Sequence, residues 1–389
     1  MLDPKTIRRA QIATALSFFL NGLGQGTFIS RIPDLKHQLG ISNSVLGGSL
    51  FVGAAGVISS LQLSGWLCAK YGSGPVTRIL NFTLFITPPL IALNINLVSF
   101  SVALYIHGFI YAAQDVAMNA EGSTLEINSS KRVMSRFHAL WSLGTLTGGA
   151  IGGLATQLKI APLNHFFFIV TISLAVSIAI RDLHLNSEVD KHVLEHRQRE
   201  KRPRIFFILG ILGFCGAIGE GAASDWGGIL IRDTFHATGF LIALPYVLFC
   251  TTMVSGRLSG DFLAHKFGIK NLITFTGLMA GIGLTLGLII GGKVGVLLAW
   301  FILGAGLSVS IPMMFSAAGK IAEREFKNKI SGGEAIAIVS GITYFGFVFG
   351  PPIMGSISDQ IGLRWAMMIP AGLAIILALG ARKVLTSSS

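Results

Sequence analysis

Charged residues are scarce in this sequence, and acidic residues are the scarcest. Asp, Glu, Lys and Arg make up only 12% of the 389 residues, and 18 residues are acidic. An average soluble domain carries about twice that fraction of charge. Hydrophobic residues reach 52%, and the mean hydropathy is +0.69. These values exclude an ordinary soluble domain and predict a membrane protein that crosses the bilayer several times.

Cysteine and the common enzyme signatures are also rare or missing. The three cysteines, Cys68, Cys215 and Cys250, lie in or beside apolar segments, so we expect small buried residues and no disulfide framework. The sequence has no phosphate-binding G-x-x-x-x-G-K-[ST] motif and no residue cluster with metal-ligand spacing. We therefore predict a protein that is not an enzyme, needs no cofactor or metal, and takes its energy from a gradient.

Twelve apolar segments are each long enough to cross a bilayer as a helix. They lie at approximately 10–30, 44–67, 78–97, 99–121, 134–157, 163–181, 205–230, 238–260, 271–291, 294–318, 333–356 and 365–381. The sequence therefore predicts an all-α membrane protein.

The basic residues give this protein a predicted orientation. If the N-terminus is cytoplasmic, 24 of the 30 Lys and Arg residues fall on the cytoplasmic side and 6 on the other. The positive-inside rule then places both termini in the cytoplasm, with the chain in the inner (cytoplasmic) membrane. The net charge of +12 is explained in this way and does not indicate a nucleic-acid partner.

A polar stretch at 182–204 divides the segments into two sets of six, which predicts bundles at 1–181 and 205–389 joined by a cytoplasmic linker. The two halves also share local sequence. Gly24-Gln25-Gly26 returns as Gly219-Glu220-Gly221, and "LSG" at 63–65 returns at 258–260, both at an offset of 195. A parallel repeat with its axis along the membrane normal is expected.

Six plus six helices with a basic central loop resemble the major facilitator superfamily of secondary transporters. The signature loop of that family follows the second helix, and "GWLCAKYGSGPVTR" keeps Gly65, Lys70 and Gly72, with a later Arg78. Ala69 stands where the family has an aspartate. The resemblance implies the twelve-helix facilitator fold, a functional monomer, and a cytoplasmic gate loop that contains these four matching or related residues.

A more specific resemblance lies in "QDVAMNAEG" (114–122), "VMSRFHALWSLGTLTGG" (133–149) and "GEGAASDW" (219–226). These motifs are similar to those of the YbjJ-like (rhizopine-permease-like) branch of bacterial facilitators. This resemblance implies the uptake or export of a small solute.

Polar residues recur every three or four positions on otherwise apolar segments, so they form stripes along helices. Lipid would leave such stripes unsatisfied, so we expect them to face one another or a water-filled cavity. The stripes are Thr14, Ser17, Asn21 and Gln25; His107, Tyr111, Asp115 and Asn119; His138, Trp141, Ser142 and Thr145; and Glu220 with Ser224.

Carboxylates are the most costly members of these stripes, at about 2.5 to 3.5 kcal/mol for a charged Asp near a helix centre. Asp115 is predicted to bind a proton or a cationic solute, or else to form a structural ion pair with Arg136. Glu121 is predicted to be a structural partner of Lys70 or Arg78 in the neighbouring loop.

Glu220 has no cation at comparable depth in its own segment, and it is the titratable counterpart of Gln25. We expect it to bind a proton or the solute, or else to be a neutral group bonded to the first helix. Trp141 is expected to contact solute and His138 to move protons or to be a structural donor, whereas Trp226 suits a membrane-interface anchor.

The function predicted from these observations is secondary active transport of a small polar solute (a sugar, a cyclitol or a similar metabolite), with a proton as the coupling ion. Asn21, Gln25, Asp115, Asn119, His138, Trp141, Ser142 and Glu220 are the candidate binding or coupling residues. Two alternatives stay open. A multidrug-type efflux antiporter would need an aromatic and Met-lined pocket around Met313 and Met314, and a membrane sensor or scaffold would need a cytoplasmic output domain.

Overall fold

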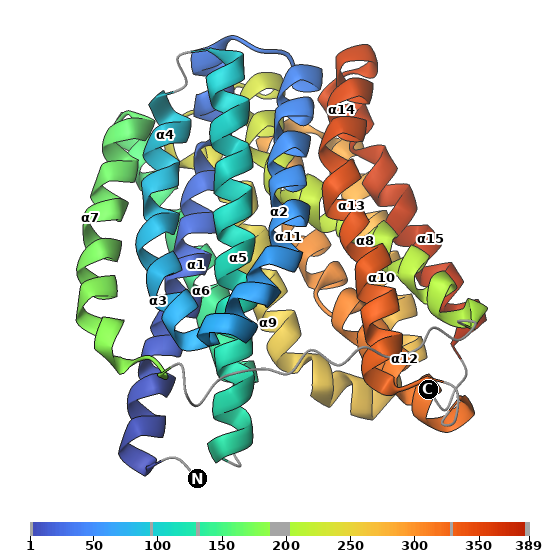
Figure 1. Cartoon of the computed structure of the whole chain (residues 1–389). Coiled ribbons are helices and arrows are strands. Elements are labelled where there is room, and N and C mark those ends of the chain that lie inside the picture. Colours follow the sequence, from blue (N-terminus) through green and yellow to red (C-terminus); the bar gives the residue numbers. More distant parts are fainter. Residues whose placement is uncertain (1–2, 94–95, 130–132, 187–202, 327–329, 386–389) are drawn as a thin grey trace. The chain divides into compact units, whose positions relative to one another are not determined.

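The computed structural model describes residues 3–93, 96–129, 133–186, 203–326 and 330–385, and these residues are helical almost throughout, with no β-strand among them (Figure 1). Two compact units divide the chain. Unit 1 comprises Met1–Ile41 and Ser49–His196, and unit 2 comprises Ser42–Gly48 and Arg197–Ser389. The boundary at 196/197 lies within the expected linker of 182–204, most of which is outside the described residues. Ser42–Gly48 differs from the expected division because it clusters with unit 2.

Unit 1 contains the helices that correspond to the first six expected segments. They are α1 (Pro4–Leu39), α2 (Asn43–Tyr71), α3 (Ser73–Thr83) continued by η1 (Leu84–Ile86) and α4 (Thr87–Leu93), α5 (Leu97–Ser129), α6 (Met134–Gln157) and α7 (Pro162–Ile180), followed by η2 (Arg181–Leu183). Helices α1, α2 and α5 extend beyond the expected bounds at both ends.

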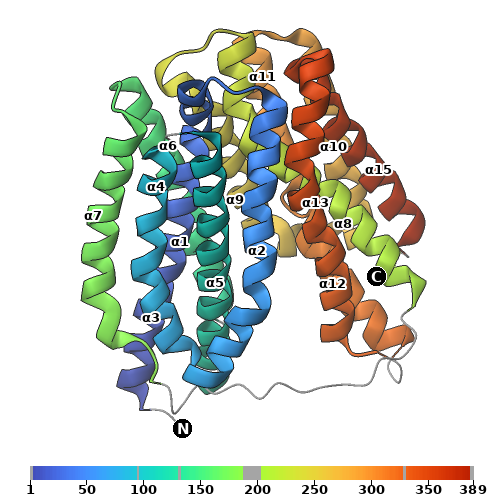
Figure 2. The same cartoon turned by 45° about the horizontal axis from the view of Figure 1, so that its top comes forward.

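Unit 2 contains the counterparts of the last six segments (Figure 2). They are α8 (Arg204–Ile229), η3 (Leu230–Thr234), η4 (Gly239–Ile242), α9 (Leu244–Phe267), α10 (Ile269–Ile290), α11 (Gly292–Leu307), α12 (Ser310–Glu325), α13 (Gly332–Ile361), α14 (Leu363–Ala366) and α15 (Met368–Val384). The single helix expected at 294–318 is in fact broken, because α11 ends at Leu307 and α12 begins at Ser310.

Ten helices in the described residues are long and apolar enough to cross a membrane. The helices α6 and α9 are not among the ten, and both carry charged side chains within their length, such as Arg136 in α6 and Arg257 in α9. Charged side chains at such positions are costly in a membrane, so they are candidates for function.

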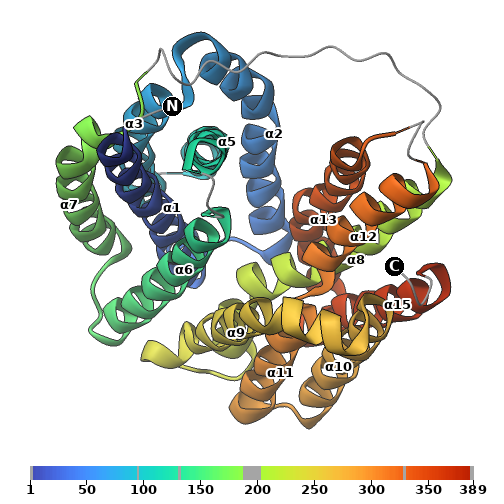
Figure 3. The same ribbon diagram turned by 90° about the horizontal axis from the view of Figure 1, so that it is seen from below.

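Close helix contacts repeat in the two units. In unit 1, α1 packs along α6, with α7 outside α1 and α3 (Figure 3). Gly22 and Gly26 of α1 and Gly144 and Gly148 of α6 lie so close to the opposite backbone that an added Cβ would overlap a carbonyl oxygen. In unit 2, α8 packs along α13 in the same way, and a Cβ at Gly346 would lie 2.6 Å from the carbonyl oxygen of Phe214. Glycines thus allow the paired helices of each unit to pack closely.

The first turn of α2, which belongs to unit 2 with Ser42–Gly48, receives a cap from α13 of the same unit. The Asp359 carboxylate accepts hydrogen bonds from the backbone N–H of Asn43 at 3.1 Å and of Ser44 at 2.9 Å, and from the Ser44 hydroxyl. These N–H groups have no partner within α2, and a negative charge is favourable at the helix N-terminus. This cap explains why Ser42–Gly48 clusters with unit 2.

Candidate functional site

An ion pair joins two apolar helices of unit 2. Nη2 of Arg257 in α9 lies 3.2 Å from Oε2 and 3.5 Å from Oε1 of Glu220 in α8. The Arg257 side chain is 33% exposed and that of Glu220 is 12% exposed, so the pair is partly accessible. Nε of Arg257 is buried with no partner among the described residues. The guanidinium is therefore incompletely bonded, and a solute oxygen could bond to the exposed part of this side chain.

Glu220 has no cation at comparable depth in its own segment, as expected, but a neighbouring helix supplies one. Arg257 lies 37 positions away along the chain. A signal was present in the sequence, since Arg257 is the single charged residue in the apolar segment 238–260. At the repeat offset of 195, Glu220 and Arg257 correspond to Gln25 and Gln62, so both charges of unit 2 are replaced by amides in unit 1.

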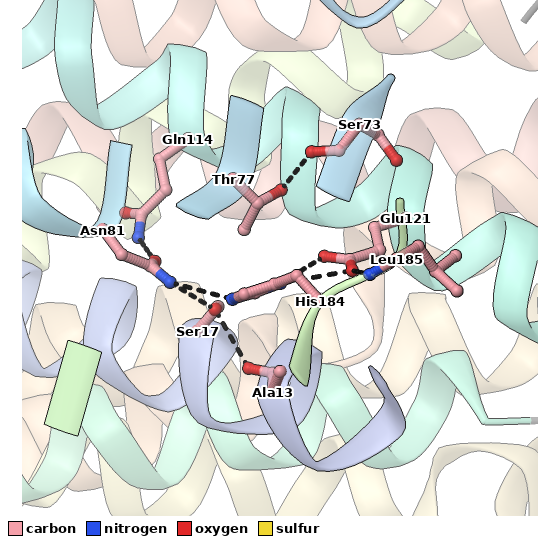
Figure 4. A network of polar contacts seen from close by, with 9 residues as sticks. All are labelled: Ala13, Ser17, Ser73, Thr77, Asn81, Gln114, Glu121, His184 and Leu185. Atoms are coloured by element: carbon pink, nitrogen blue, oxygen red, sulfur yellow. Dashed lines mark hydrogen bonds and ion pairs between the residues drawn. The ribbon is translucent and has the colours of Figure 1, made fainter. Parts of the chain in front are cut away.

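Unit 1 instead holds a chain of buried side-chain hydrogen bonds. Nε1 of Trp141 donates to Oδ1 of Asn21 at 2.9 Å, and Nδ2 of Asn21 donates to Oε1 of Gln114 at 2.8 Å. Nε2 of Gln114 donates to Oδ1 of Asn81 at 2.5 Å, and Nδ2 of Asn81 donates to the Ser17 hydroxyl at 2.8 Å (Figure 4). Asn21, Gln114, Asn81 and Ser17 are each at most 1% exposed. Helices α1, α3, α5 and α6 are tied together through this chain.

The chain continues to a buried histidine and glutamate. Nδ2 of Asn81 lies 3.4 Å from Nε2 of His184, whose Nδ1 lies 2.9 Å from Oε2 of Glu121. The Glu121 carboxylate also accepts the backbone N–H of Leu185 at 2.9 Å (Figure 4). The prediction that Glu121 pairs with Lys70 or Arg78 is therefore wrong, because the recorded partners of Glu121 are His184 and the Leu185 backbone. His184 and Leu185 are 8% and 2% exposed, so this part of the expected linker is packed into unit 1.

Asp115 does not pair with Arg136 in the described part of the chain. Its Oδ1 and backbone oxygen both accept from Nδ2 of Asn119, at 3.1 and 2.8 Å, one turn along α5. Arg136 is exposed at the start of α6. The half-buried Asp115 thus has one amide partner and no recorded cation, which leaves its role as a proton or cation site open to test.

The remaining candidate binding residues of unit 1 differ in how deeply they are buried. The Ser142 hydroxyl donates to the backbone oxygen of His138 at 3.0 Å and is bound within its own helix. His138 is exposed, and its ring contacts Phe18 edge-on at 5.2 Å between centroids. Gln25 and Trp141 are half-buried, whereas Asn21 is fully buried. The stripe on α1 therefore does not face one cavity, since Asn21 and Ser17 point into the bundle.

The loop between α2 and α3 is built on aromatic contacts. Nζ of Lys70 lies 4.7 Å from the ring centre of Trp66 and 5.1 Å from that of Tyr71. Gly72 ends the loop with φ of 86°, which favours glycine, and Gly268 has the same role in unit 2 with φ of 78°. Gly65 has open space around its Cα, and Arg78 is half-buried.

Three further residues differ from their expected roles. Met313 and Met314 are 7% and 0% exposed within an apolar cluster of unit 2, so they are packed core residues rather than the walls of a drug pocket. Trp226 is fully buried in unit 2, so its indole packs inside the protein and does not face outward as a membrane-interface anchor would. The described residues hold no cluster of three or more His, Cys, Asp or Glu side chains that could bind a metal ion.

A family model described as "Major Facilitator Superfamily" matches residues 14–333. The chain belongs to this superfamily. Membrane protein MosC of Rhizobium meliloti is 30% identical over 369 residues, which cover 94% of this chain and 88% of MosC. An uncharacterised facilitator-type transporter of Yersinia pestis is 26% identical over 380 residues, covering 96% and 95% of the two chains. These relatives and the helical architecture make the chain a multi-pass membrane protein of the transporter class.

Solved structures show the same fold at low sequence identity. A D-xylose–proton symporter is similar with a TM-score of 0.75 and 13% identity over 98% of this chain and 99% of the other. A bacterial homologue of the human lysosomal transporter Spinster is similar with a TM-score of 0.77 and 12% identity over 99% and 97%. The expected twelve-helix facilitator fold is thereby confirmed.

Proposed function

We propose that this facilitator is a secondary active transporter that moves a small polar solute, such as a sugar or a cyclitol, by alternating access together with a proton. The observation that carries the proposal is the Glu220–Arg257 pair, which is partly exposed on otherwise apolar helices and is incompletely bonded. Charged side chains in such helices are costly and are typical of solute or proton pathways.

The chemistry of the pair suits a hydroxylated solute. A guanidinium with a spare donor and a carboxylate with spare acceptor sites can bond to neighbouring hydroxyl groups at the same time. When Glu220 takes up a proton, its attraction to Arg257 is lost, so solute binding and proton binding affect the same two side chains. The similarity of fold to a D-xylose–proton symporter supports a sugar-like solute and a proton.

In unit 1, we propose that the half-buried Trp141 and Gln25 contact the solute, that Asn21 fixes the indole of Trp141, and that Asp115 with Asn119, His138 and Ser142 completes the polar lining. The protein is proposed to act as a monomer in the cytoplasmic membrane with both termini in the cytoplasm. The excess of Lys and Arg on that side supports this orientation.

Uptake into proteoliposomes tests the transport proposal. Purified protein is supplied with labelled sugars and cyclitols, with and without an acidic external buffer, and we expect the pH gradient to accelerate uptake of at least one of them. Glu220→Gln keeps the shape of the side chain but cannot bind and release a proton, so its uptake is expected to lose the stimulation by the gradient. Stimulation equal to that of the wild type in Glu220→Gln would disprove its coupling role.

Asp261→Asn is the matched control, since Asp261 is an exposed acid one turn from Arg257 on the same helix. It is expected to keep full stimulation. The double variant Glu220→Gln with Arg257→Gln reproduces the Gln25 and Gln62 arrangement of unit 1, and we expect it to fold more stably than Arg257→Gln alone, because no unpaired carboxylate remains.

A further inference from the structure

All hydrogen bonds of the unit 1 chain run from donor to acceptor in the same direction. The residues at its two ends, Trp141 and His184, fix that direction. An indole N–H can only donate, so the Asn21 atom that faces Trp141 must be oxygen. The Asn21 amide then presents nitrogen to Gln114, which must present oxygen in return, and the same argument fixes Gln114 against Asn81. Every donor from Trp141 onward therefore points toward His184.

The other end of the chain fixes the state of His184. Nδ2 of Asn81 has two hydrogens, of which one is donated to Ser17 at 2.8 Å and the other points to Nε2 of His184 at 3.4 Å. Nε2 must accept, so the imidazole proton is on Nδ1, from which it is donated to Glu121. With the proton on Nδ1, His184 completes the row of hydrogen bonds without any donor facing another donor.

We propose that the buried His184–Glu121 pair is a proton-binding site of this transporter, and that the three amides transmit its occupancy to the indole of Trp141. The inference rests on the proposed transport function. His184 lies in the segment that the sequence predicts to be a linker, and the structure buries it in unit 1.

The step can be followed atom by atom. A proton that binds Nε2 of His184 would turn the Asn81–His184 contact into a meeting of two donors. Asn81 must then rotate its amide to present Oδ1, after which Gln114 and Asn21 must rotate in turn, because each would otherwise face its neighbour with the same kind of atom. The Ser17 hydroxyl, which donates to the Ala13 backbone oxygen, would then face Oδ1 of the rotated Asn81 and could donate to it. At the end of the series, Nδ2 of Asn21 meets the indole N–H as donor against donor, so the indole must turn away from Asn21, and its N–H can then bond to a solute oxygen.

The surroundings of His184 support a site for one proton. Among the described residues, Glu121 of α5 is the charged group in contact with the ring, while α1 and α3 present Ser17 and Asn81. Arg181 and Asp182 of η2 pair with each other at 3.1 Å and are 57% and 69% exposed. An imidazolium formed here would therefore be balanced by Glu121 within hydrogen-bond distance.

The consequence for transport is reciprocal. If a proton on His184 frees the Trp141 indole for the solute, a solute that bonds to the indole must favour a proton on His184 by the same free energy. Proton and solute would then bind cooperatively, which is the sign that symport requires. The KM for solute is expected to fall as the pH is lowered.

Tryptophan fluorescence tests this proposal without any solute. The emission of the wild-type protein in detergent is followed between about pH 5 and 8, the range in which histidine titrates. We expect a reversible transition that is lost in Trp141→Phe, because Trp141 is its reporter, and lost in His184→Gln, because glutamine does not titrate. In Glu121→Gln the transition is expected to move to lower pH, since a neutral amide does not stabilise the imidazolium.

His165→Gln is the control, because His165 is also a buried histidine of unit 1, 2% exposed, and takes no part in this chain of hydrogen bonds. It is expected to keep the transition. If His184→Gln does not fold, Gln114→Met tests the proposal instead. This variant removes the hydrogen bonds between Asn21 and Asn81 and leaves the His184–Glu121 pair in place. A transition that persists in His184→Gln or in Gln114→Met, or that is absent from the wild type, would overturn the proposal.

The two proposals can fail separately. Intact pH-stimulated uptake without the fluorescence transition would reject only the His184 site. A fluorescence transition in a protein that moves none of the tested solutes would reject only the transport proposal.

Discussion

The two units share a helix plan but differ in the places where they keep polar side chains. Unit 1 has a polar interior, in which amides, a hydroxyl, a histidine and a carboxylate bond to one another across helices. At the repeat offset of 195, Ser17 and Asn21 of unit 1 correspond to Leu212 and Gly216 of unit 2. Unit 2 is therefore apolar at these two positions. Unit 2 keeps its charges in the more exposed Glu220–Arg257 pair, at positions that are Gln25 and Gln62 in unit 1.

This difference indicates a division of labour within a repeated fold. Polar groups that satisfy one another in a dry interior hold fixed orientations, because any unpaired member would be costly. A pair that is partly exposed and incompletely bonded can instead exchange its partners for a ligand. Unit 1 thus has the properties of a positioning framework, and unit 2 has those of a binding and coupling centre.

We expect the largest loss of stability from a substitution in the polar interior of unit 1. Asn81→Leu in α3 removes the residue at which the unit 1 chain branches, so Gln114, Ser17 and His184 lose a partner. At 1–3 kcal/mol for each unsatisfied buried group, we expect a loss of about 2 to 4 kcal/mol in the free energy of unfolding. Unfolding by SDS in mixed micelles measures this loss.

Thr276→Val in α10 is the matched change in unit 2. The Thr276 hydroxyl donates only to the backbone oxygen of Leu272 in its own helix, so we expect a loss of about 1 kcal/mol or less. Equal losses for Asn81→Leu and Thr276→Val would contradict the contrast between a linked and an unlinked interior.

A smaller effect is expected at the paired glycines. A Cβ at Gly148 of α6 would overlap the carbonyl oxygen of Leu23, whereas a Cβ at the related Gly350 of α13 would meet its nearest atom at 3.8 Å. Gly148→Ala is expected to lose about 1 to 3 kcal/mol of unfolding free energy, as in other overpacked sites.

Gly350→Ala is expected to have little effect or to stabilise by up to about 1 kcal/mol, because alanine is the better helix former. The same unfolding measurement compares the two variants. A loss on Gly350→Ala as large as that on Gly148→Ala would show that α13 packs against α8 as tightly as α6 packs against α1.

The smallest effect concerns the loops after α2 and α9. Lys70 lies over two aromatic rings, and Lys266 lies over one, with Nζ 5.3 Å from the ring centre of Phe267. An exposed cation–π contact contributes about 0.5 to 1 kcal/mol. Lys70→Ala is therefore expected to destabilise by more than Lys266→Ala does, with both losses below about 2 kcal/mol. The opposite order would mean that the ring contacts of Lys70 do not stabilise the loop.

The helices could be predicted from the sequence, because a bilayer requires about 20 apolar residues for each crossing and the twelve segments meet that requirement. The break between Leu307 and Ser310 was missed, although Pro312 near the start of α12 was a signal, since proline is poorly tolerated inside a helix.

Partners were harder to predict than elements. Glu121 and His184 are 63 positions apart, and Asn21 and Gln114 are 93 apart. Helical periodicity tells which side chains share a face of one helix, but it does not tell which face of another helix lies opposite. Arg257 and His184 were overlooked for this reason, and the expected pair of Asp115 with Arg136 was wrong.

The cap that Asp359 gives to Asn43 and Ser44 has a consequence for the start of α2. Ser42–Gly48 belongs to unit 2 together with Asp359, so the contact lies within that unit. Without the carboxylate, the backbone N–H groups of Asn43 and Ser44 would lose their acceptors. In Asp359→Ala, the amide hydrogens of this first turn are therefore expected to exchange with solvent faster than those in the middle of α2.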